Sequence, residues 1–254
     1  MPFNVAVILA FGILITSLMV MVAIASRRKQ AAKEDEMRRA ASARGWKFEG
    51  TRERGHRIHR WTGTTEGVPW VAESLVVTPS GNHRQKHPHV ARWTAQWNPG
   101  FSGAILAMGL PKGKEQLGPA VAAGDGLFAK LAQKAAGFAF DKAIDAYFGE
   151  GPGKEVDAGA MHRIETKIPG FIIMAADKNE GSRLLSQGLE TALIDATKDR
   201  TSALSNENRP WILLRPKAVS LARMDRFHGI DDVDGFVRAG VALTRTSRFG
   251  RPFV

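Results

Sequence analysis

The chain has 254 residues, 44% of them hydrophobic and 24% charged, which is enough for one domain with a sizeable core, or two small ones, plus accessory segments. It contains no cysteine. This excludes disulfides, thiolate nucleophiles and cysteine-ligated zinc, and leaves histidine and carboxylates as metal ligands. The formal charge of +11 is uneven: residues 27–100 carry 15 basic and 7 acidic side chains, whereas residues 101–254 carry 21 and 18. The basic excess therefore lies close to the N-terminus.

Residues 5–25 (VAVILAFGILITSLMVMVAIA) contain no charged side chain. A helix of this length rises about 30 Å, the thickness of the hydrocarbon core of a bilayer. A cleaved signal peptide is the alternative, because Ala23, Ile24 and Ala25 have a small-x-small form. The start MPFN has no basic region, however, and the apolar run is longer than that of a typical signal peptide. The sequence therefore predicts an uncleaved transmembrane anchor at residues 1–26.

Arg27, Arg28 and Lys29 directly follow this apolar run, and nothing basic precedes it except the amino terminus. Basic residues are enriched on the cytoplasmic side of membrane helices, and each contributes about 1 kcal/mol at an anionic leaflet. We therefore expect these three residues to contact the membrane surface. The expected location is a bacterial inner (plasma) membrane, with the N-terminus outside and residues 26–254 in the cytoplasm.

Residues 27–44 (RRKQAAKEDEMRRAASAR) are rich in good helix formers and contain no glycine or proline. We expect them to extend the membrane helix as a polar stalk, with Glu34 paired to Arg38 one turn later and Gly45 as the stop. A solvated connector is favoured over a partner-binding or lipid-sensing helix, because a run of mixed charges is usually a solvated face.

Residues 45–110 form a β-rich segment, in which short runs alternate between apolar and polar side chains as half-buried antiparallel strands do. The expected strands are WKFEG, RIHRWTGT, PWVAESLVV, VARWTAQW and GAILAMGL. Five of the six tryptophans of the chain lie here. They could bind a ligand or stack on bases, but the core of a small sheet is the favoured interpretation. The tryptophans expected in the core are Trp46, Trp70, Trp93 and Trp97.

Residues 111–160 are expected to hold a linker rich in glycine and proline and then an amphipathic helix at residues 127–148, capped by Asp125. This helix is basic and apolar on different faces, so it could lie in a membrane interface or cover the sheet.

Residues 161–254 show the pattern strand, helix, strand, strand, helix. The expected strands are at residues 170–177, 211–215 and 218–224, and the expected helices are at residues 178–198 and, after an Asp231 cap, at 232–247. The fold class is α+β, a mostly antiparallel, tryptophan-rich sheet with packed helices behind a transmembrane helix and a helical stalk. Residues 45–254 could form one domain or two.

Three short motifs resemble an uncharacterised bacterial family of single-pass, N-terminally membrane-anchored proteins. The first motif, Gly-Trp-x-Phe, is Gly45, Trp46 and Phe48, and the second, Gly-x-Pro-Trp-x-x-Glu, includes Gly67, Pro69, Trp70 and Glu73. The third is a strand, an acidic turn at Ala176 and Asp177, and a helix with Leu184 and Leu185. The resemblance implies an anchor, a stalk and a β-rich domain, and it implies no catalytic residue.

The sequence offers few groups arranged for catalysis. No phosphate-binding glycine loop and no nucleophile elbow occur. Glu73 is the only acid placed between apolar strand residues. It could be a catalytic carboxyl with a raised pKa, but a position in solvent or beside an arginine is favoured.

Three histidines, two arginines and a lysine occur within residues 83–93 (HRQKHPHVARW). His87 and His89 are two apart, so on a strand they share a face, and His83 could fold back toward them. His56 and His59 belong to a candidate neighbouring strand but are three apart, so they face opposite sides.

Zinc requires three or four donors at about 2.0–2.1 Å in tetrahedral geometry. The cationic side chains among the histidines repel a dication, and Pro88 disfavours a helix that could align them. A solvated hairpin loop is therefore favoured over a metal site or a protonation switch. The candidate residues for either site are His83, His87, His89, His56 and His59.

The leading hypothesis is a membrane-tethered cytoplasmic scaffold or interaction module with no evident catalytic activity, which binds a protein partner or itself. The first alternative is a peripheral binder of anionic lipid surfaces that uses the basic segments and the helix at residues 127–148. The second is a metal-dependent enzyme built on the histidine tract, with zinc as its cofactor. Nucleic acid is disfavoured as a partner, because membrane topology explains the charge and no recognised binding motif is present.

Overall fold

The structure is a computed structural model, and it describes most of the chain. The described residues are 3–53, 56–77, 89–96, 103–110, 141–149, 151–152, 156, 161–168, 170–205 and 208–246, with the side chains of 3–10, 12, 77 and 246 left out.

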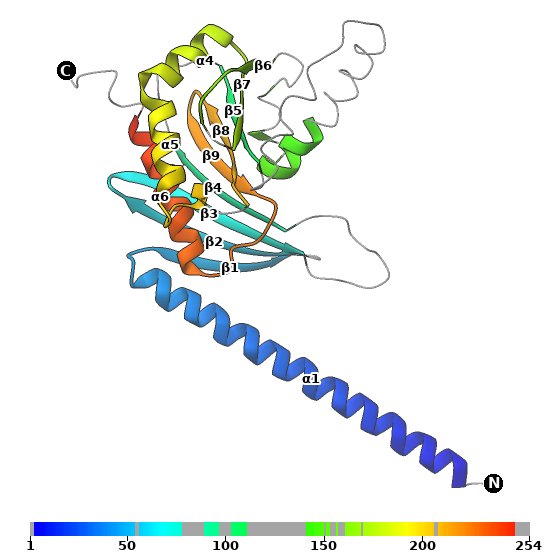
Figure 1. The fold of residues 1–254 in the computed structure, drawn as a ribbon. Helices are drawn as coiled ribbons and strands as arrows, with labels where there is room; N and C mark the ends of the chain where they lie inside the picture. The colour runs from blue at the N-terminus through cyan, green and yellow to red at the C-terminus, as the bar shows by residue number, and fades with distance from the viewer. Residues whose placement is uncertain are drawn as a thin grey trace, which may run out of the picture.

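The described chain begins with one long helix and continues as a strand-rich α+β fold (Figure 1). The helix α1 spans Phe3–Ser42. The strands are β1 (Lys47–Glu53), β2 (His56–Thr65), β3 (Val68–Val77), β4 (Val90–Gln96), β5 (Ile105–Gly109), β6 (His162–Ile164), β7 (Phe171–Ala175), β8 (Trp211–Arg215) and β9 (Ala218–Arg223). The later helices are α4 (Lys178–Leu184), the π-helical turn η3 (Leu185–Leu189), α5 (Glu190–Lys198), the 3-10 turn η4 (Ala203–Ser205) and α6 (Ile230–Thr246).

All nine strands belong to one sheet with the order β1-β2-β3-β4-β9-β8-β5-β7-β6. Each pairing is antiparallel, which confirms the α+β class and the antiparallel sheet of the prediction. β4 pairs with β9, and β5 lies between β8 and β7. Strands from before residue 110 and from after residue 161 are therefore interleaved. The short strand β6 is not indicated by the sequence pattern.

One row of side chains crosses all nine strands on the same face of the sheet. The strand register places its members side by side, and every one of them is buried: Phe48, Trp61, Ala72, Trp93, Leu221, Ile212, Ala107, Ile173 and Ile164. Strand residues that point to one face repeat every two positions, so the alternating pattern of the sequence produces this continuous apolar surface.

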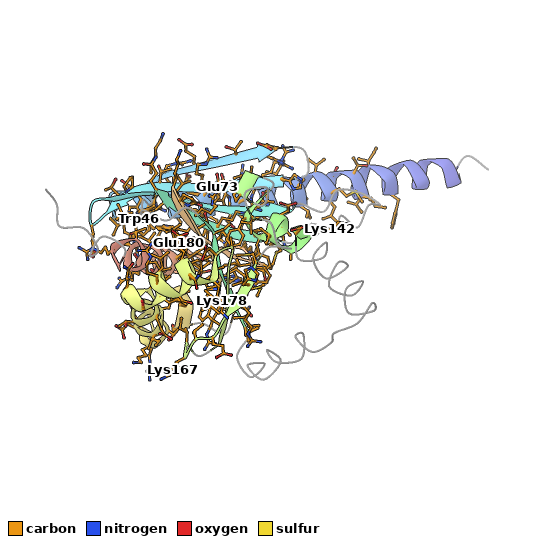
Figure 2. All side chains as sticks on the ribbon, turned by 90° about the horizontal axis from the view of Figure 1, so that it is seen from above. Trp46, Glu73, Lys142, Lys167, Lys178 and Glu180 are labelled. Atoms are coloured by element: carbon orange, nitrogen blue, oxygen red, sulfur yellow. The ribbon has the colours of Figure 1, made fainter. Side chains whose placement is uncertain are left out.

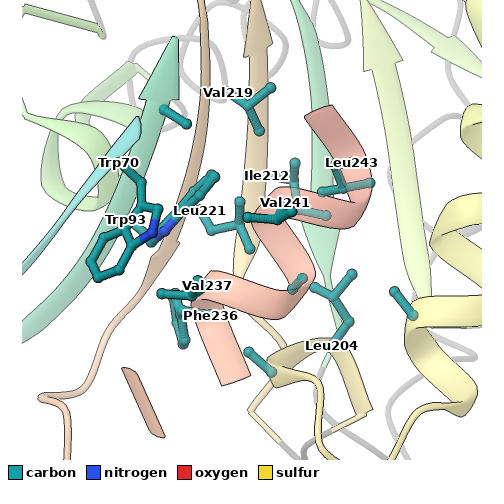
Figure 3. Close-up of a cluster of buried hydrophobic side chains, with 14 of the residues drawn as sticks. Trp70, Trp93, Leu204, Ile212, Val219, Leu221, Phe236, Val237, Val241 and Leu243 are labelled. Atoms are coloured by element: carbon teal, nitrogen blue, oxygen red, sulfur yellow. The ribbon is translucent and has the colours of Figure 1, made fainter. Parts of the chain in front are cut away.

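Helix α6 covers the middle of this surface, and Figure 3 shows its apolar side chains against those of the strands. The helix buries Phe236, Val237, Val241 and Leu243. It comes close to the sheet at Gly240, where an added Cβ would lie 2.2 Å from the Trp93 ring. Figure 2 shows side chains filling the body of the domain, while the N-terminal part of α1 extends beyond it.

The opposite face of the sheet is covered in part by a helix at residues 141–148. This helix buries Ile144 and Phe148 against strand residues that include Leu106 and Leu213. The end of the predicted helix at 127–148 therefore covers the sheet, and residues 127–140 lie outside the described residues, as do the predicted linker and the Asp125 cap.

Arg92 of β4 holds the end of this helix. Its guanidinium donates to the carbonyl oxygens of Tyr147 (2.6 Å) and Ala146 (3.1 Å), which are unsatisfied by the helix itself. Burial lowers the pKa of Arg92, and the Glu73 carboxylate opposes this shift. Glu73 itself accepts from Arg60 Nε at 2.7 Å, as the favoured interpretation of that acid expects.

The single helix predicted at residues 178–198 is broken in the structure. Asp177 caps α4 by accepting from the backbone N–H groups of Asn179 (2.8 Å) and Glu180 (2.9 Å). The helix then loses regular geometry at Gln187 and Gly188, and Gly188 has a φ of 108°. Glycine adopts this conformation without strain, so α4 and α5 can follow different directions over the sheet.

The prediction that Asp231 caps the last helix is wrong. α6 begins at Ile230, two residues before the predicted start, and places Asp231 in its first turn. Its carboxylate accepts instead from Arg44 Nη2 at 2.8 Å, which connects α6 to the end of α1. Carboxylates in a first helical turn are also stabilised by the helix dipole, so the sequence signal for a helix start was correct to within two residues.

Helix α1 ends at Ser42, and Gly45 follows with a φ of 72°. The predicted pair of Glu34 and Arg38 is absent, because Arg38 donates to Asp35 (2.6 Å) and Glu34 faces the sheet. Met37 and Ala41 are buried in the main core, so residues 27–44 are more than a solvated connector.

Among the side chains that the structure describes, no helix has both the length and the apolar character needed to cross a membrane. The side chains of residues 5–10 and 12, which belong to the expected span, lie outside the described set.

The close approach of α6 to the sheet gives a direct test of the core. Gly240→Ala adds a methyl group against the fully buried Trp93 and should lower the free energy of unfolding by about 1–3 kcal/mol. Gly229→Ala is the matched control: its added methyl meets no atom within 4 Å, so only the loss of a favourable N-cap residue remains, and stability should fall by less than about 1 kcal/mol. Urea unfolding of the full chain in neutral detergent, followed by tryptophan fluorescence, measures both. Equal stability of the two variants would contradict the described packing.

Candidate functional site

A groove of about 200 Å³ lies where α1 meets the sheet. Three parts of the chain form it: α1, the strands β2 and β3, and the loop between β9 and α6. Its lining residues are Gln30, Lys33, Glu34, Met37, Arg57, His59, Val76, Arg226 and Phe227. Only His59 among them was expected at a site from the sequence.

Glu34 is the acid of the groove, and its carboxylate lies beside Gly50 of β1. A Cβ on Gly50 would lie 3.4 Å from Glu34 Oε2. Glu34 Oε1 lies 3.6 Å from Arg57 Nε and 3.5 Å from His59 Nε2, and Arg57 Nη2 also donates to Gln30 Oε1 at 2.7 Å. These contacts fix the stalk part of α1 against β2.

His59 is largely buried between the groove and the aromatic core. Its ring lies 5.6 Å from that of Phe48 and 6.0 Å from that of Trp61. Burial lowers the pKa of His59, and the Glu34 carboxylate opposes the shift without reversing it. The imidazole is therefore neutral at pH 7, and the contact with Glu34 is no charged pair there.

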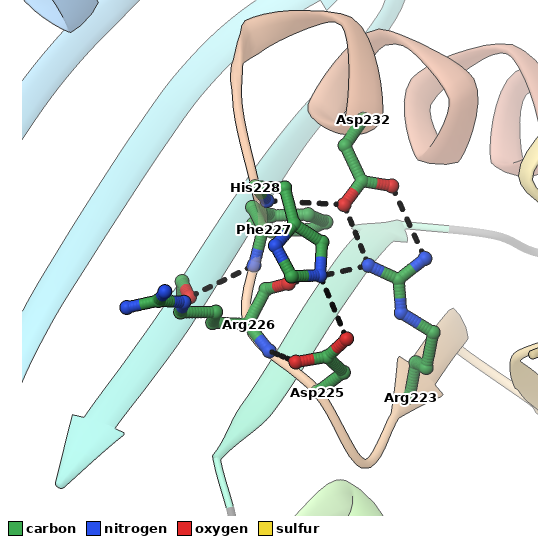
Figure 4. Close-up of polar contacts among 7 residues, drawn as sticks. Arg223, Asp225, Arg226, Phe227, His228 and Asp232 are labelled. Atoms are coloured by element: carbon green, nitrogen blue, oxygen red, sulfur yellow. Dashed lines mark hydrogen bonds and ion pairs between the residues drawn. The ribbon is translucent and has the colours of Figure 1, made fainter.

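The loop between β9 and α6 is fixed by a buried ion pair at its base (Figure 4). Arg223 donates to Asp232 through Nη2 (2.6 Å) and Nη1 (3.1 Å), in the bidentate geometry that makes such pairs strong. The same Nη2 lies 3.3 Å from the Arg226 carbonyl, and His228 N donates to Asp232 at 3.2 Å. The pair thus holds both ends of the loop.

Phe227, a buried residue of this loop, connects the groove to the core. Its backbone N–H donates to Ser74 Oγ of β3 at 3.2 Å. Its ring packs edge to face on Trp61 (5.5 Å) and on Phe236 of α6 (5.0 Å). Figure 4 shows the neighbouring Arg226 side chain directed away from the Arg223–Asp232 pair.

The groove carries more positive than negative charge. Lys33, Arg57 and Arg226 are cationic, Glu34 is the one carboxylate in the lining, and His59 is neutral. Neither the Lys33 ammonium nor the Arg226 guanidinium has a hydrogen-bond or ion-pair partner among the described residues. None of the lining residues carries a hydroxyl or a thiol, so the arrangement suits binding of an anion better than nucleophilic catalysis.

The structure does not bring the histidines of the sequence analysis together. His83 and His87 lie outside the described residues, and His89 is exposed just before β4. His56 and His59 lie on opposite faces of β2. The described part of the chain contains no group of three or more potential metal ligands, and the zinc site stays a prediction.

The other residues singled out from the sequence are placed as follows. Trp46, Trp70 and Trp93 are buried, and Trp46 packs edge to face on Trp70 at 4.9 Å. Trp97 lies outside the described residues. Arg27, Arg28 and Lys29 are exposed on α1, and their contact with a membrane stays a prediction.

Sequence reasoning missed Lys33, Glu34, Arg57 and Arg226 as one group. The first two lie in the stalk and the others on a strand and in a loop, up to 193 positions away. Charged side chains at such separations give no local pattern, and their meeting depends on the strand order of the sheet.

Comparisons of the chain with protein-family models, with curated proteins and with solved structures give no match. The resemblance to membrane-anchored bacterial proteins therefore stays a prediction, and the function is argued from the residues themselves.

The ion pair that fixes the loop can be tested within one helix. Asp232→Asn leaves the Arg223 guanidinium buried beside a neutral partner and should lower the free energy of unfolding by about 3–5 kcal/mol. Asp234→Asn removes a surface carboxylate that pairs with Arg238 at 2.9 Å and should cost less than about 1 kcal/mol. Urea unfolding of the full chain measures both, and similar losses would show that the buried pair does not fix the loop.

His59 should make stability depend on pH. Because its folded-state pKa is below the ordinary value of 6.5, the unfolded chain takes up the proton first, and the free energy of unfolding should fall as the pH drops below about 6.5. Lys33 and Arg57 also oppose protonation, while Glu34 favours it.

His59→Gln should flatten this dependence between pH 7 and about pH 5, whereas His162→Gln, at an exposed position of β6, should retain it. Urea midpoints of the full chain across the pH range give the comparison. A steeper profile in His59→Gln would mean that His59 is stabilised in its charged form.

Proposed function

We propose that the chain is an interaction module without catalytic activity, held at the cytoplasmic face of a bacterial inner membrane by residues 1–26. The N-terminal half of α1 carries the proposal. Ten large apolar side chains between Phe11 and Ile24 are 45–68% exposed, and among the described residues the only other exposed large apolar side chain is Val71. A surface of this kind is rare on a soluble monomer, whereas lipid chains would cover it. For residues 1–10, whose side chains the structure does not describe, the proposal rests on the sequence alone.

The orientation follows from the charges that flank this surface. Arg27, Arg28 and Lys29 are exposed on α1 directly after the apolar part. Basic residues at that place favour a cytoplasmic position for everything that follows. The sheet and its helices would then lie on the inner side of the membrane.

Helix α1 also supports the proposal that the domain presents its interaction surface at a fixed position near the membrane. α1 is continuous from the exposed apolar half to the buried Met37 and Ala41. Its end is joined to α6 through Arg44 and Asp231 (2.8 Å) and to β2 through Glu34. A domain attached in this way would hold its groove near the bilayer, in contrast to a domain on a flexible linker.

The absence of cysteine allows the orientation to be tested with single introduced thiols. In intact spheroplasts, a membrane-impermeant maleimide should label Pro2→Cys, and it should label Lys217→Cys, in the exposed turn between β8 and β9, only after lysis. The full chain should remain in the membrane fraction after alkaline extraction. Recovery in the soluble fraction, or labelling of Lys217→Cys from outside, would rule out the proposed arrangement.

The interaction part of the proposal has its own test. The full chain, extracted in mild detergent after crosslinking in cells, should run as a complex with a defined partner or with itself. A monomer without a crosslinked species, from cells in which the membrane location holds, would argue against an interaction module while leaving the anchor in place.

A further inference from the structure

We infer that the groove between α1, β2 and the loop before α6 binds a phosphate group. The inference starts from charge. Three cations and one carboxylate line the groove, and His59 is neutral, which leaves an excess of two positive charges. A phosphate monoester carries about −1.5 to −2 charges at pH 7, so it would balance this excess, whereas a single carboxylate would not.

The cations come from three different elements and converge on one cavity. Arg57, from β2, is held in place by Gln30 and Glu34. Lys33 comes from α1 and Arg226 from the loop, and neither has a partner among the described residues. A concave surface lined by charge of one sign concentrates ions of the other sign, and arginine and lysine are the usual donors to phosphate oxygens.

The apolar residues of the groove indicate the kind of molecule to which the phosphate group would belong. Met37, Val76 and Phe227 give the groove an apolar part beside its cations. Its volume of about 200 Å³ is below the roughly 300–1,000 Å³ of pockets that enclose a whole drug-sized ligand. The groove therefore suits the phosphate end of a larger, partly apolar molecule.

Two sources of such a group fit the place of the groove. From Ala25, the end of the apolar run, α1 rises about 7.5 Å to Gln30 and about 12 Å to Lys33. The headgroup layer on one side of a bilayer is about 5–7 Å thick, so an upright α1 places the groove just beyond it, and a tilted one brings it closer. A phospholipid headgroup can therefore reach it, and so can a soluble phosphate ester. Only the lipid source rests on the proposed anchor.

The experiment uses the full chain in two settings. In the first, inorganic phosphate is titrated calorimetrically into the protein in neutral detergent. In the second, the protein is placed in nanodiscs of phosphatidylcholine with or without phosphatidic acid, and native mass spectrometry counts the phosphatidic acid that it retains. Binding only in the second setting identifies a lipid source, and binding in the first identifies a site open to soluble phosphate.

Three substitutions define the site. Lys33→Gln and Arg226→Gln should each weaken binding at least about tenfold, because each removes a charge-assisted hydrogen bond. Glu34→Gln should strengthen it, because the competing carboxylate is lost. Lys217→Gln removes an exposed positive charge outside the groove and should leave the affinity within about twofold.

Urea midpoints like that of the wild type would show that the variants are folded. Binding in neither setting would overturn the inference, and so would equal losses in Lys33→Gln, Arg226→Gln and Lys217→Gln. Thiol labelling reports the anchor independently, so failure of the phosphate site and failure of the membrane location are distinguishable.

Discussion

The burial of one face of the nine-stranded sheet is the constraint on which the rest of the structure depends. The row from Phe48 to Ile164 crosses every strand, and it is complete only when β4 lies beside β9 and β5 beside β8. Burying the rings of Trp61 and Trp93 in this row stabilises the fold by about 4–6 kcal/mol each, before the cost of ordering the chain. The two halves of the chain are thus needed together, because neither supplies a covered apolar face alone.

The aromatic part of this core also positions the groove. Phe236 of α6 packs on Phe227, and Phe227 packs on Trp61 of β2. The loop that bears Phe227 is fixed at its base by Arg223 and Asp232, and the Arg223 guanidinium lies 5.2 Å from the Phe236 ring. One wall of the groove is therefore an extension of the core, which holds the Phe227 ring in place.

The sequence was sufficient for the fold class and for most strands, because alternation of apolar and polar residues is a local signal. It was insufficient where one residue breaks a longer pattern, as at Gly188, or where a tertiary partner competes with a local one. Asp231 resembles a helix cap in the sequence but pairs with Arg44, which is 187 positions away. Glu34 was predicted to pair with Arg38, one turn along the helix, but instead lies beside Arg57 of β2. The groove depends on such pairings throughout, so no local pattern could indicate it.

The other wall of the groove, α1, is attached differently. It contributes only Met37 and Ala41 to the main core, and its remaining described contacts with the sheet and α6 are polar: Glu34 with Arg57 and His59, Gln30 with Arg57, and Arg44 with Asp231. The Arg44–Asp231 pair is exposed and contributes little to stability, and the contacts of Glu34 are only partly buried, whereas the wall formed by β2 and Phe227 is fixed by buried aromatic rings. Local opening occurs where few buried apolar contacts must be broken. Separation of α1 from the sheet at the groove would therefore break few buried apolar contacts, chiefly those of Met37 and Ala41.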